Sequence, residues 1–242
     1  MNSSETFRNK LTVVIPAHNE QAMVGAVVRE VICQLDGLEL AGFASEVLVV
    51  DDGSRDATFQ EARRAGACVL RHVINCGLGA AIGTGFQAAL RRGATIVVTL
   101  DADGQHDPRD IPQLIAPILN DTADVVIGSR LLAQAAQAIG MPLDRRLINW
   151  GANMITWLLF GAWTTDSQSG LRALNRRALE QIHIKTNRME VASEIIAETS
   201  RLRLRLAEVP IAAVYTDYSL QKGQTNANSL PVLFKLLLRK LR

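Results

Sequence analysis

The chain has 242 residues, with 26 Lys and Arg against 24 Asp and Glu, so its charge is nearly balanced. This balance argues against a protein that binds nucleic acid by charge alone, and the length suits one large α/β domain. Cys33, Cys68 and Cys76 form no CxxC pair and no zinc-type spacing, which indicates a reducing compartment. The polar segment 1–10 contains no apolar signal region, so we expect a cytosolic protein.

Apolar runs typical of strands alternate with helical patterns through the first half of the chain. The runs contain few polar residues, which indicates strands buried on both faces of a parallel sheet. Such an alternation predicts a doubly wound, mostly parallel sheet flanked by helices, with ligands at the carboxyl ends of its strands. Strands are expected at residues 11–17, 46–50, 68–71, 96–98 and 124–128, and helices at 21–35, from about 54 to 67, from the glycine-rich loop 75–85 to about 92, and at 111–119.

The second half of the chain is more varied. Residues 147–165 carry no charge, but Asn149, Asn153 and Thr156 recur at helical spacing, which favours a buried or interfacial helix over a membrane span. A polar loop is expected at 165–172, helices at 176–182 and 190–203, and an edge strand at 206–211 because it contains Pro210.

The C-terminal residues form a basic amphipathic pattern. Lys235, Arg239 and Arg242 alternate with leucines at helical spacing, so we expect one domain at 1–228 followed by a helix at 229–242. The pattern suits a helix that binds an anionic membrane and equally a helix that packs on the protein.

Two carboxylates follow the apolar run 96–98. Asp101 and Asp103 are separated by one residue, so side chains that alternate along an extended segment would point the same way and could hold a divalent cation. Gln105 continues the same parity. Such residues also occur in ordinary polar turns, but Glu20, Asp52 and Arg130 also follow expected strands and should meet Asp103 in one crevice.

The glycine-rich segment 75–85 suggests a dinucleotide site as a rival interpretation. Its spacing has three residues where the GxGxxG fingerprint has two, and it follows the third expected strand instead of the first. We therefore expect these glycines to shape a tight helix entry.

Five sequence blocks, in order and spacing, resemble the inverting GT-A glycosyltransferases of family 2, and within them the dolichol- or polyprenyl-phosphate sugar synthases. The blocks are VIPAHNE at 14–20, VVDDGS at 49–54, residues 75–85, LDADGQH at 100–106 and IGSR at 127–130. The resemblance implies transfer of a sugar, with inversion, from a GDP- or UDP-sugar to a polyprenyl phosphate at the cytoplasmic face of the membrane. It also implies a Mg²⁺ or Mn²⁺ ion, and membrane contact that is peripheral or made through a partner.

The resemblance assigns roles to residues of this chain. Asp103, Gln105 and Asp101 would hold the metal, and Asp103, Arg130, Arg145 and Lys222 would serve the reaction. The acceptor phosphate would lie near Arg130, Arg145, Asn149 and Lys222. The donor would contact Pro16, Ala17, His18, Glu20, Val50, Asp52, Asp101, Ala102 and Asp103.

One departure leaves the acceptor class open. After the expected edge strand the synthases present an arginine and a glycine-serine-lysine-like turn, of which only Lys222 and Gly223 have counterparts here. A hydroxyl acceptor would need a general base, for which Glu190 or Glu194 is the candidate, although both suit surface positions on an amphipathic helix. A non-catalytic nucleotide-sugar-binding or membrane-scaffold protein and a nicotinamide oxidoreductase are the remaining alternatives.

Overall fold

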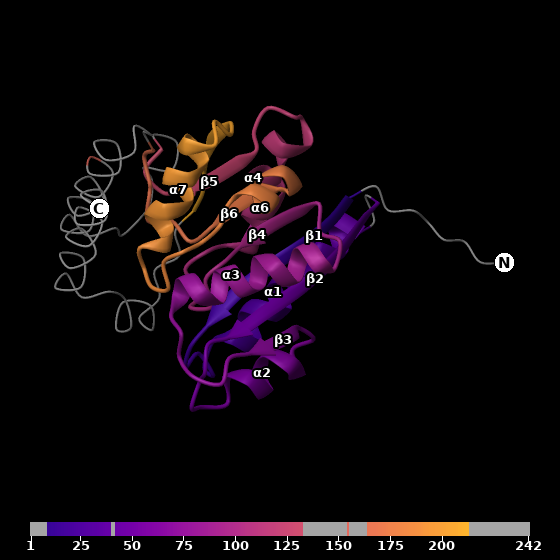
Figure 1. Ribbon diagram of the computed structural model, residues 1–242. Coiled ribbons are helices and arrows are strands. Elements are labelled where there is room, and N and C mark those ends of the chain that lie inside the picture. The colour runs from indigo at the N-terminus through magenta and orange to yellow at the C-terminus, as the bar shows by residue number, and fades with distance from the viewer. Residues whose placement is uncertain (1–8, 40–41, 133–153, 155–163, 213–242) are drawn as a thin grey trace.

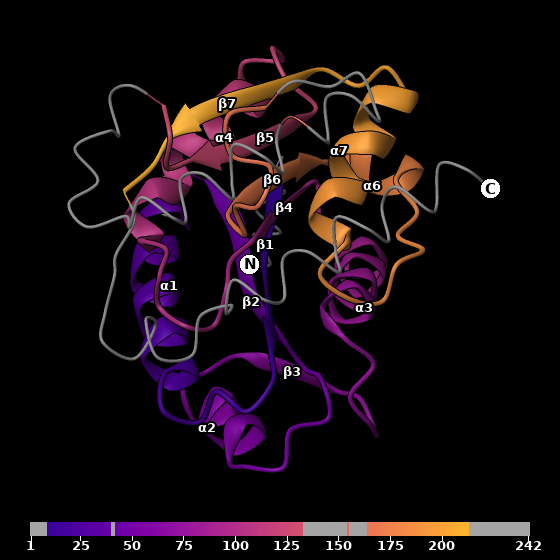
Figure 2. The same cartoon turned by 90° about the vertical axis from the view of Figure 1, so that its left-hand side faces the viewer.

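The computed structural model describes residues 9–39, 42–132, 154 and 164–212. In this part of the chain, one seven-stranded mixed sheet has the order β3-β2-β1-β4-β6-β5-β7 (Figures 1 and 2). Its strands are β1 Asn9–Ala17, β2 Phe43–Asp51, β3 Cys68–Arg71, β4 Ile96–Thr99, β5 Val125–Ser129, β6 Arg172–Asn175 and β7 Leu206–Pro210.

Helices cover both faces of this sheet. Figure 2 shows α1 on one side and α3 on the other. The helices are α1 Val24–Glu39, α2 Thr58–Arg64, α3 Leu78–Arg91, α4 Ile111–Leu119, α6 Arg176–Gln181 and α7 Val191–Arg201, with a 3₁₀ turn at Pro108–Asp110.

Alternate residues of the central strands enter two separate cores. Val13 and Ile15 of β1 pack into the core that contains residues of α1, α2 and α4, whereas Val14 packs with α3, α6 and α7. Because both faces are buried, the apolar strand runs contain few polar residues. The sequence prediction of a doubly wound, mostly parallel sheet is confirmed.

One strand was not predicted. β6 runs antiparallel to both β4 and β5, between which it lies, while β1 to β5 and β7 share one direction. The expected polar loop at 165–172 therefore ends one residue too late, since Arg172 begins β6. The predicted edge position of β7 is confirmed among the described strands.

The reversed strand determines what lies at the site. Because β6 runs against its neighbours, its first residue pairs with Thr99 at the carboxyl end of β4. The loop before β6 is thereby brought to the edge where the parallel strands end.

Some predictions fall outside the described residues, namely the amphipathic helix at 229–242 and almost all of the uncharged segment at 147–165. In the described part of the chain, no helix is both long enough and apolar enough to span a bilayer.

Candidate functional site

An acidic cluster lies beyond the end of β4. Burial, together with the negative charges of Asp101 and Glu20, raises the pKa of Asp103 to about 6, although the Gln105 backbone N–H donates to Asp103 Oδ1 (3.0 Å). Three carboxylates that repel one another gain from a cation placed among them. These three carboxylates therefore suit a hard divalent ion, which the sequence predicted for Asp101 and Asp103.

His106 adds a contact that the sequence did not assign. The residue is 4% exposed, Nε2 lies 3.2 Å from Asp101 Oδ2, and Nδ1 has no partner among the described residues. Burial raises the pKa of Asp101, but His106, Arg130 and Arg172 outweigh that effect and hold the pKa below its usual range. Asp101 is thus kept ionised beside Asp103.

The loop that precedes β6 lies directly against Asp101. A Cβ added to Gly170 would stand 2.0 Å from Asp101 Oδ2, so only glycine fits this position without displacement of the carboxylate. The Thr99 hydroxyl donates to the Gly170 carbonyl (2.7 Å) and fixes the loop at the end of β4.

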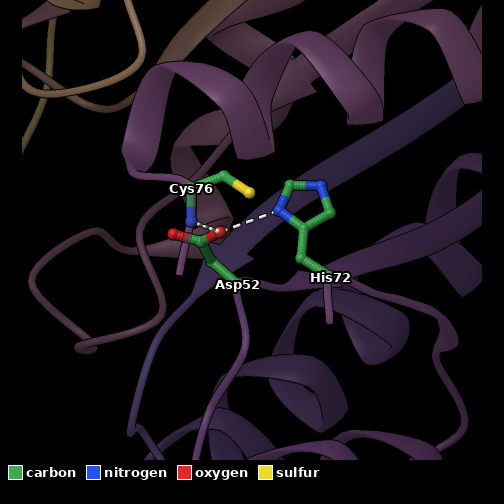
Figure 3. Close-up of side chains that lie close together, drawn as sticks. All are labelled: Asp52, His72 and Cys76. Carbon is green, nitrogen blue, oxygen red and sulfur yellow. Dashed lines mark hydrogen bonds and ion pairs between the residues drawn. The ribbon is translucent and has the colours of Figure 1, made fainter. Parts of the chain in front are cut away.

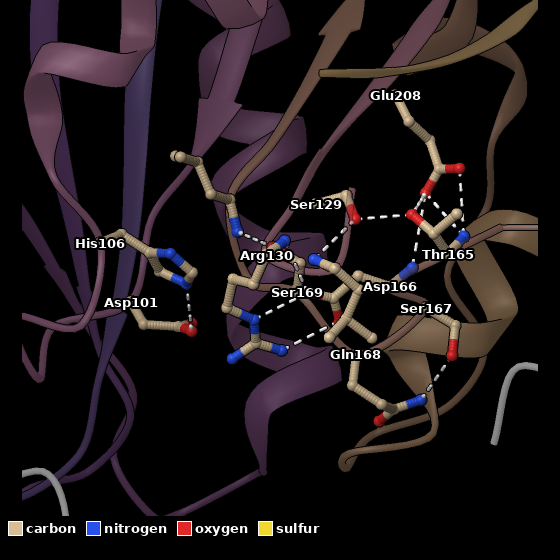
Figure 4. A network of polar contacts seen from close by, with 12 residues as sticks. Asp101, His106, Ser129, Arg130, Thr165, Asp166, Ser167, Gln168, Ser169 and Glu208 are labelled. Carbon is tan, nitrogen blue, oxygen red and sulfur yellow. Dashed lines mark hydrogen bonds and ion pairs between the residues drawn. The ribbon is translucent and has the colours of Figure 1, made fainter. Parts of the chain in front are cut away.

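Arg130 reaches this loop from the end of β5 (Figure 4). Its Nε donates to Asp166 Oδ2 (2.7 Å) and its Nη2 to Asp166 Oδ1 (2.9 Å), in a bidentate pair whose carboxylate is fully buried. Burial raises the pKa of Asp166, and Arg130 brings it below the usual range. The charge of Arg130 is therefore largely offset inside the protein.

Arg172, the first residue of β6, also holds this loop. Its guanidinium donates to three backbone carbonyls, those of Ser169 (2.9 Å), Ala192 (2.8 Å) and Ser167 (2.7 Å). Burial lowers the pKa of Arg172 to about 10, and the charges of Asp166 and Asp101 partly compensate. This buried arginine joins the loop to the start of α7.

A fourth set of contacts to this loop comes from the edge strand β7. Glu208 accepts from the Thr165 backbone N–H (2.8 Å) and hydroxyl (2.9 Å), and the Thr165 and Ser129 hydroxyls lie 2.6 Å apart (Figure 4). Residues 164–171 are therefore tied to β4, β5, β7 and α7.

The loops after β1 and β2 interlock on the other side of the site. His18 Nδ1 donates to the Asp52 carbonyl (2.9 Å), and Thr58 Oγ1 accepts from the Glu20 backbone N–H (2.8 Å). Pro16 lies beside Val50 in the parallel pair of β1 and β2. Residues that the resemblance assigns to the donor thus lie at one sheet edge, while their contacts with a donor stay a prediction.

Asp52 forms a compact cluster with His72 and Cys76 (Figure 3). Its Oδ1 lies 2.7 Å from His72 Nδ1 and accepts from the Cys76 backbone N–H (2.8 Å), while Oδ2 accepts from Gly77 N–H (2.7 Å). Because His72 Nε2 also contacts the Thr84 hydroxyl (3.0 Å), each polar atom has a partner without an ion.

The Asp52 cluster also has the composition of a metal site. Its potential ligand atoms all lie within 4.8 Å of one another. The carboxylate is nevertheless satisfied by three N–H groups, which favours a structural role, whereas Asp101, Asp103 and Glu20 repel one another. The acidic cluster therefore stays the predicted metal site.

The glycine-rich loop begins α3 next to the loop before α7. The second and third amides of α3, those of Gly79 and Ala80, donate to the Asn187 carbonyl (2.9 and 3.3 Å). In a dinucleotide site these amides would bind a pyrophosphate. The expectation of a structural helix entry fits this arrangement.

Two carboxylates expected at surface positions are buried. Glu190 is 8% and Glu194 5% exposed. Glu194 accepts from the backbone N–H groups of Lys185 (3.1 Å) and Thr186 (2.8 Å) and from the Thr186 hydroxyl (2.5 Å), so it fixes the loop before α7. Hydrophobic neighbours on α7 gave no sign that its acids also face inward.

Three predicted acceptor residues, Arg145, Asn149 and Lys222, lie outside the described residues. The structure therefore places Glu20, Asp52, Asp101, Asp103 and Arg130 at one edge of the sheet, and adds His106, Asp166, Gly170 and Arg172 to that region. The added residues were missed because their place depends on the unpredicted strand β6 or on burial.

The sequence model of the family described as Glycosyl transferase family 2 matches residues 12–183. The chain belongs to this family. Among its relatives, a UDP-N-acetylglucosamine–dolichyl-phosphate N-acetylglucosaminyltransferase of Methanococcus voltae is 35% identical over 248 residues, covering 95% of both chains. An undecaprenyl-phosphate mannosyltransferase of Micrococcus luteus is 32% identical over 213 residues, covering 85% of this chain and 84% of the relative.

A solved structure shows the same fold. Glucosyl-3-phosphoglycerate synthase from Mycobacterium tuberculosis, in complex with Mn²⁺, UDP and phosphoglyceric acid, superposes with a TM-score of 0.72 at 23% identity. The match covers 98% of this chain and 80% of that structure. This family-2 protein is therefore a glycosyltransferase of the GT-A fold, and neither the oxidoreductase nor the scaffold interpretation is supported.

Proposed function

We propose that this glycosyltransferase moves a sugar from a nucleoside-diphosphate sugar to a polyprenyl phosphate, with inversion, at the cytoplasmic face of the membrane. The observation that carries the proposal is the repelling cluster of Glu20, Asp101 and Asp103 at the sheet edge, where a cation and a diphosphate would complement the charge. The two relatives whose names give a polyprenyl-phosphate acceptor support the acceptor class.

The donor side follows from the same cluster. Asp101, Asp103 and Gln105 would hold Mg²⁺ or Mn²⁺, which supplies positive charge against the diphosphate as it leaves. His106 keeps Asp101 in place, and the interlocked loops that contain His18 and Asp52 would receive the nucleoside. Ala102 is buried, and its small side chain would leave room for the donor to approach the backbone.

The chemistry is a single displacement. An oxygen of the acceptor phosphate forms a bond to the anomeric carbon while the bond from that carbon to the diphosphate breaks, and the nucleoside diphosphate leaves with the electron pair. A phosphate monoester has a second pKa near about 6, so it is already an anionic nucleophile and needs no general base. This agrees with a Glu194 whose oxygens already accept three hydrogen bonds.

Arg130 would act at the acceptor side as a positioned donor. Asp166 offsets much of its charge, so we expect Arg130 to orient a phosphate through directed hydrogen bonds more than through net attraction. Arg145, Asn149 and Lys222 complete the proposed acceptor set.

Mass spectrometry of reactions with a panel of UDP- and GDP-sugars, short polyprenyl phosphates and Mg²⁺ or Mn²⁺ tests the proposal. We expect one lipid-linked sugar, and its loss by at least about a hundredfold in Asp103→Asn because charge stabilisation of the leaving group is removed. Clean transfer to a soluble hydroxyl, with none to polyprenyl phosphate from any donor, would refute the acceptor class.

A further inference from the structure

Exposed apolar side chains gather on two loops. Five large hydrophobic side chains are well exposed in the described part of the chain, and three of them are Val73 (99%), Ile74 (69%) and Met189 (36%). Val73 and Ile74 lie on the loop between β3 and α3, and Met189 lies on the loop between α6 and α7. We call Val73, Ile74 and Met189 the apolar rim.

The two loops lie side by side although more than a hundred residues separate them (Figure 1). The Gly79 backbone N–H donates to the Asn187 carbonyl (2.9 Å). A Cβ on Gly77 would stand 2.2 Å from that same carbonyl oxygen, so the backbones touch. The apolar rim therefore lies on two loops that are in direct contact.

The loop that carries Val73 and Ile74 is braced from inside. The His72 backbone N–H donates to the Asp51 carbonyl (2.9 Å), and Asp52 accepts from Cys76 and Gly77. Gly53, at φ +67°, leaves no room for a side chain beneath the Ile74 carbonyl. Because the backbone is fixed on this side, the two aliphatic side chains project into solvent.

The surroundings of the apolar rim are basic. Residues 71–77 and 185–189 contain Arg71, Lys185 and Arg188 and no carboxylate. Arg71 pairs with the buried Asp51 (3.1 Å), whereas Lys185 and Arg188 are exposed and form no ion pair with the described residues. Exposed aliphatic side chains beside unneutralised cations complement an anionic lipid surface.

We propose that the apolar rim, with Lys185 and Arg188, docks this enzyme on an anionic bilayer. The inference rests on the proposed function, since a polyprenyl phosphate must be reached at a membrane. The rim lies at the sheet edge where the parallel strands end, which is also the edge of Asp101 and Asp103. Docking at this edge would bring the end of the sheet that carries the acidic cluster to the lipid surface.

Co-sedimentation of the full chain with vesicles tests the docking surface. The vesicles contain phosphatidylcholine alone or mixed with phosphatidylglycerol. We expect the double variant V73D/I74D to lower the partition coefficient on mixed vesicles by about tenfold, and K185A/R188A to lower it on mixed vesicles only. The matched control is L119D, since Leu119 is 43% exposed at the far end of α4, where we expect less than about a twofold change.

Two results would overturn the proposal. One is unchanged partition of V73D/I74D, and the other is an altered oligomeric state of that variant in light scattering, because the rim would then be a protein interface. Transfer to a short, water-soluble polyprenyl phosphate should be unaffected in V73D/I74D. If the wild-type chain shows no such transfer, but its vesicle binding is lost in the rim variants, the proposed function fails and the docking surface stands.

Discussion

At the scale of single residues, the close approach of Gly170 to Asp101 leaves no room for a larger side chain at position 170. We predict that Gly170→Ala displaces the Asp101 carboxylate, because the added Cβ would stand 2.0 Å from its Oδ2. Of the three proposed metal ligands, Asp103 and Gln105 alone would then remain in place, so Mn²⁺ affinity, measured by calorimetry, should fall by about tenfold or more.

Gly37→Ala is the matched control for this substitution. Gly37 lies in α1 with no atom within 4 Å of an added Cβ, so the change should raise stability by about 0.5–1 kcal/mol and leave Mn²⁺ binding unaltered. Equal Mn²⁺ affinities for Gly170→Ala and the wild-type chain would contradict the contact.

The grouping of the proposed metal ligands beyond β4 could be predicted from the sequence, whereas the residues that support them could not. Asp101, Asp103 and Gln105 follow one strand, so local order and parity suffice to group them. Gly170 and Arg172 reach the site only because the chain comes back to the end of β4 about seventy residues later. The spacing of residues in the sequence does not predict such a long-range contact.

At the scale of secondary-structure elements, the strand β6 shows where the sequence pattern fails. Its four residues, Arg-Ala-Leu-Asn, begin with a charge and end with a helix cap, since Asn175 accepts from the Ala178 N–H (2.9 Å). A short strand with polar ends gives no period-two signal. Tertiary contacts, including the burial of Arg172, determine its structure.

We predict that Arg172→Met destabilises the protein by about 3 kcal/mol or more, because three backbone carbonyls, two of them buried, lose their donor. Urea unfolding measures the change in the free energy of unfolding. Arg176→Met, in an exposed pair with Glu180 (2.7 Å), is the control and should cost less than about 1 kcal/mol. Similar losses for the two variants would show that Arg172 is not a structural clamp.

The helix α7 offers a test of the acceptor class. Glu194 fixes the loop of Lys185 and Thr186, so we predict that Glu194→Gln lowers stability by about 1–3 kcal/mol while kcat falls less than about tenfold. Glu180→Gln, at an exposed position, is the control for both measurements. Abolished turnover with intact donor binding would instead support a general base and a hydroxyl acceptor.

At the scale of the whole molecule, the two ends of the parallel strands differ in composition and role. The carboxyl edge gathers acids, glycines and backbone amides that suit ligand binding. The opposite edge is joined by a buried carboxylate, since Asp124 accepts from Asn175 Nδ2 (2.9 Å), the Arg205 backbone N–H (2.9 Å) and the Arg205 guanidinium. The alternation of strands and helices in the sequence predicted the ligand-binding end of the sheet. At the opposite end, Asp124 links β5, β6 and β7, and these three strands are neighbours only because of the strand order in the folded sheet.

This joint makes the stability of the fold depend on pH. Hydrogen bonds from the Arg205 side chain lower the pKa of Asp124 below its usual range, and the Arg205 backbone N–H and Asn175 add to that effect. A carboxyl group with a lowered native pKa stabilises the fold above its unfolded pKa, near about 4. It loses this contribution as the pH falls toward the native value.

We therefore predict that Asp124→Asn costs about 2–3 kcal/mol near neutral pH. The difference from the wild-type chain in urea unfolding should stay constant down to about pH 5 and shrink below about pH 4, because only the wild-type chain carries the titrating group. A difference that persists undiminished at about pH 3 would mean that the variant is destabilised by altered packing, and that the charge of Asp124 does not hold the three strands together.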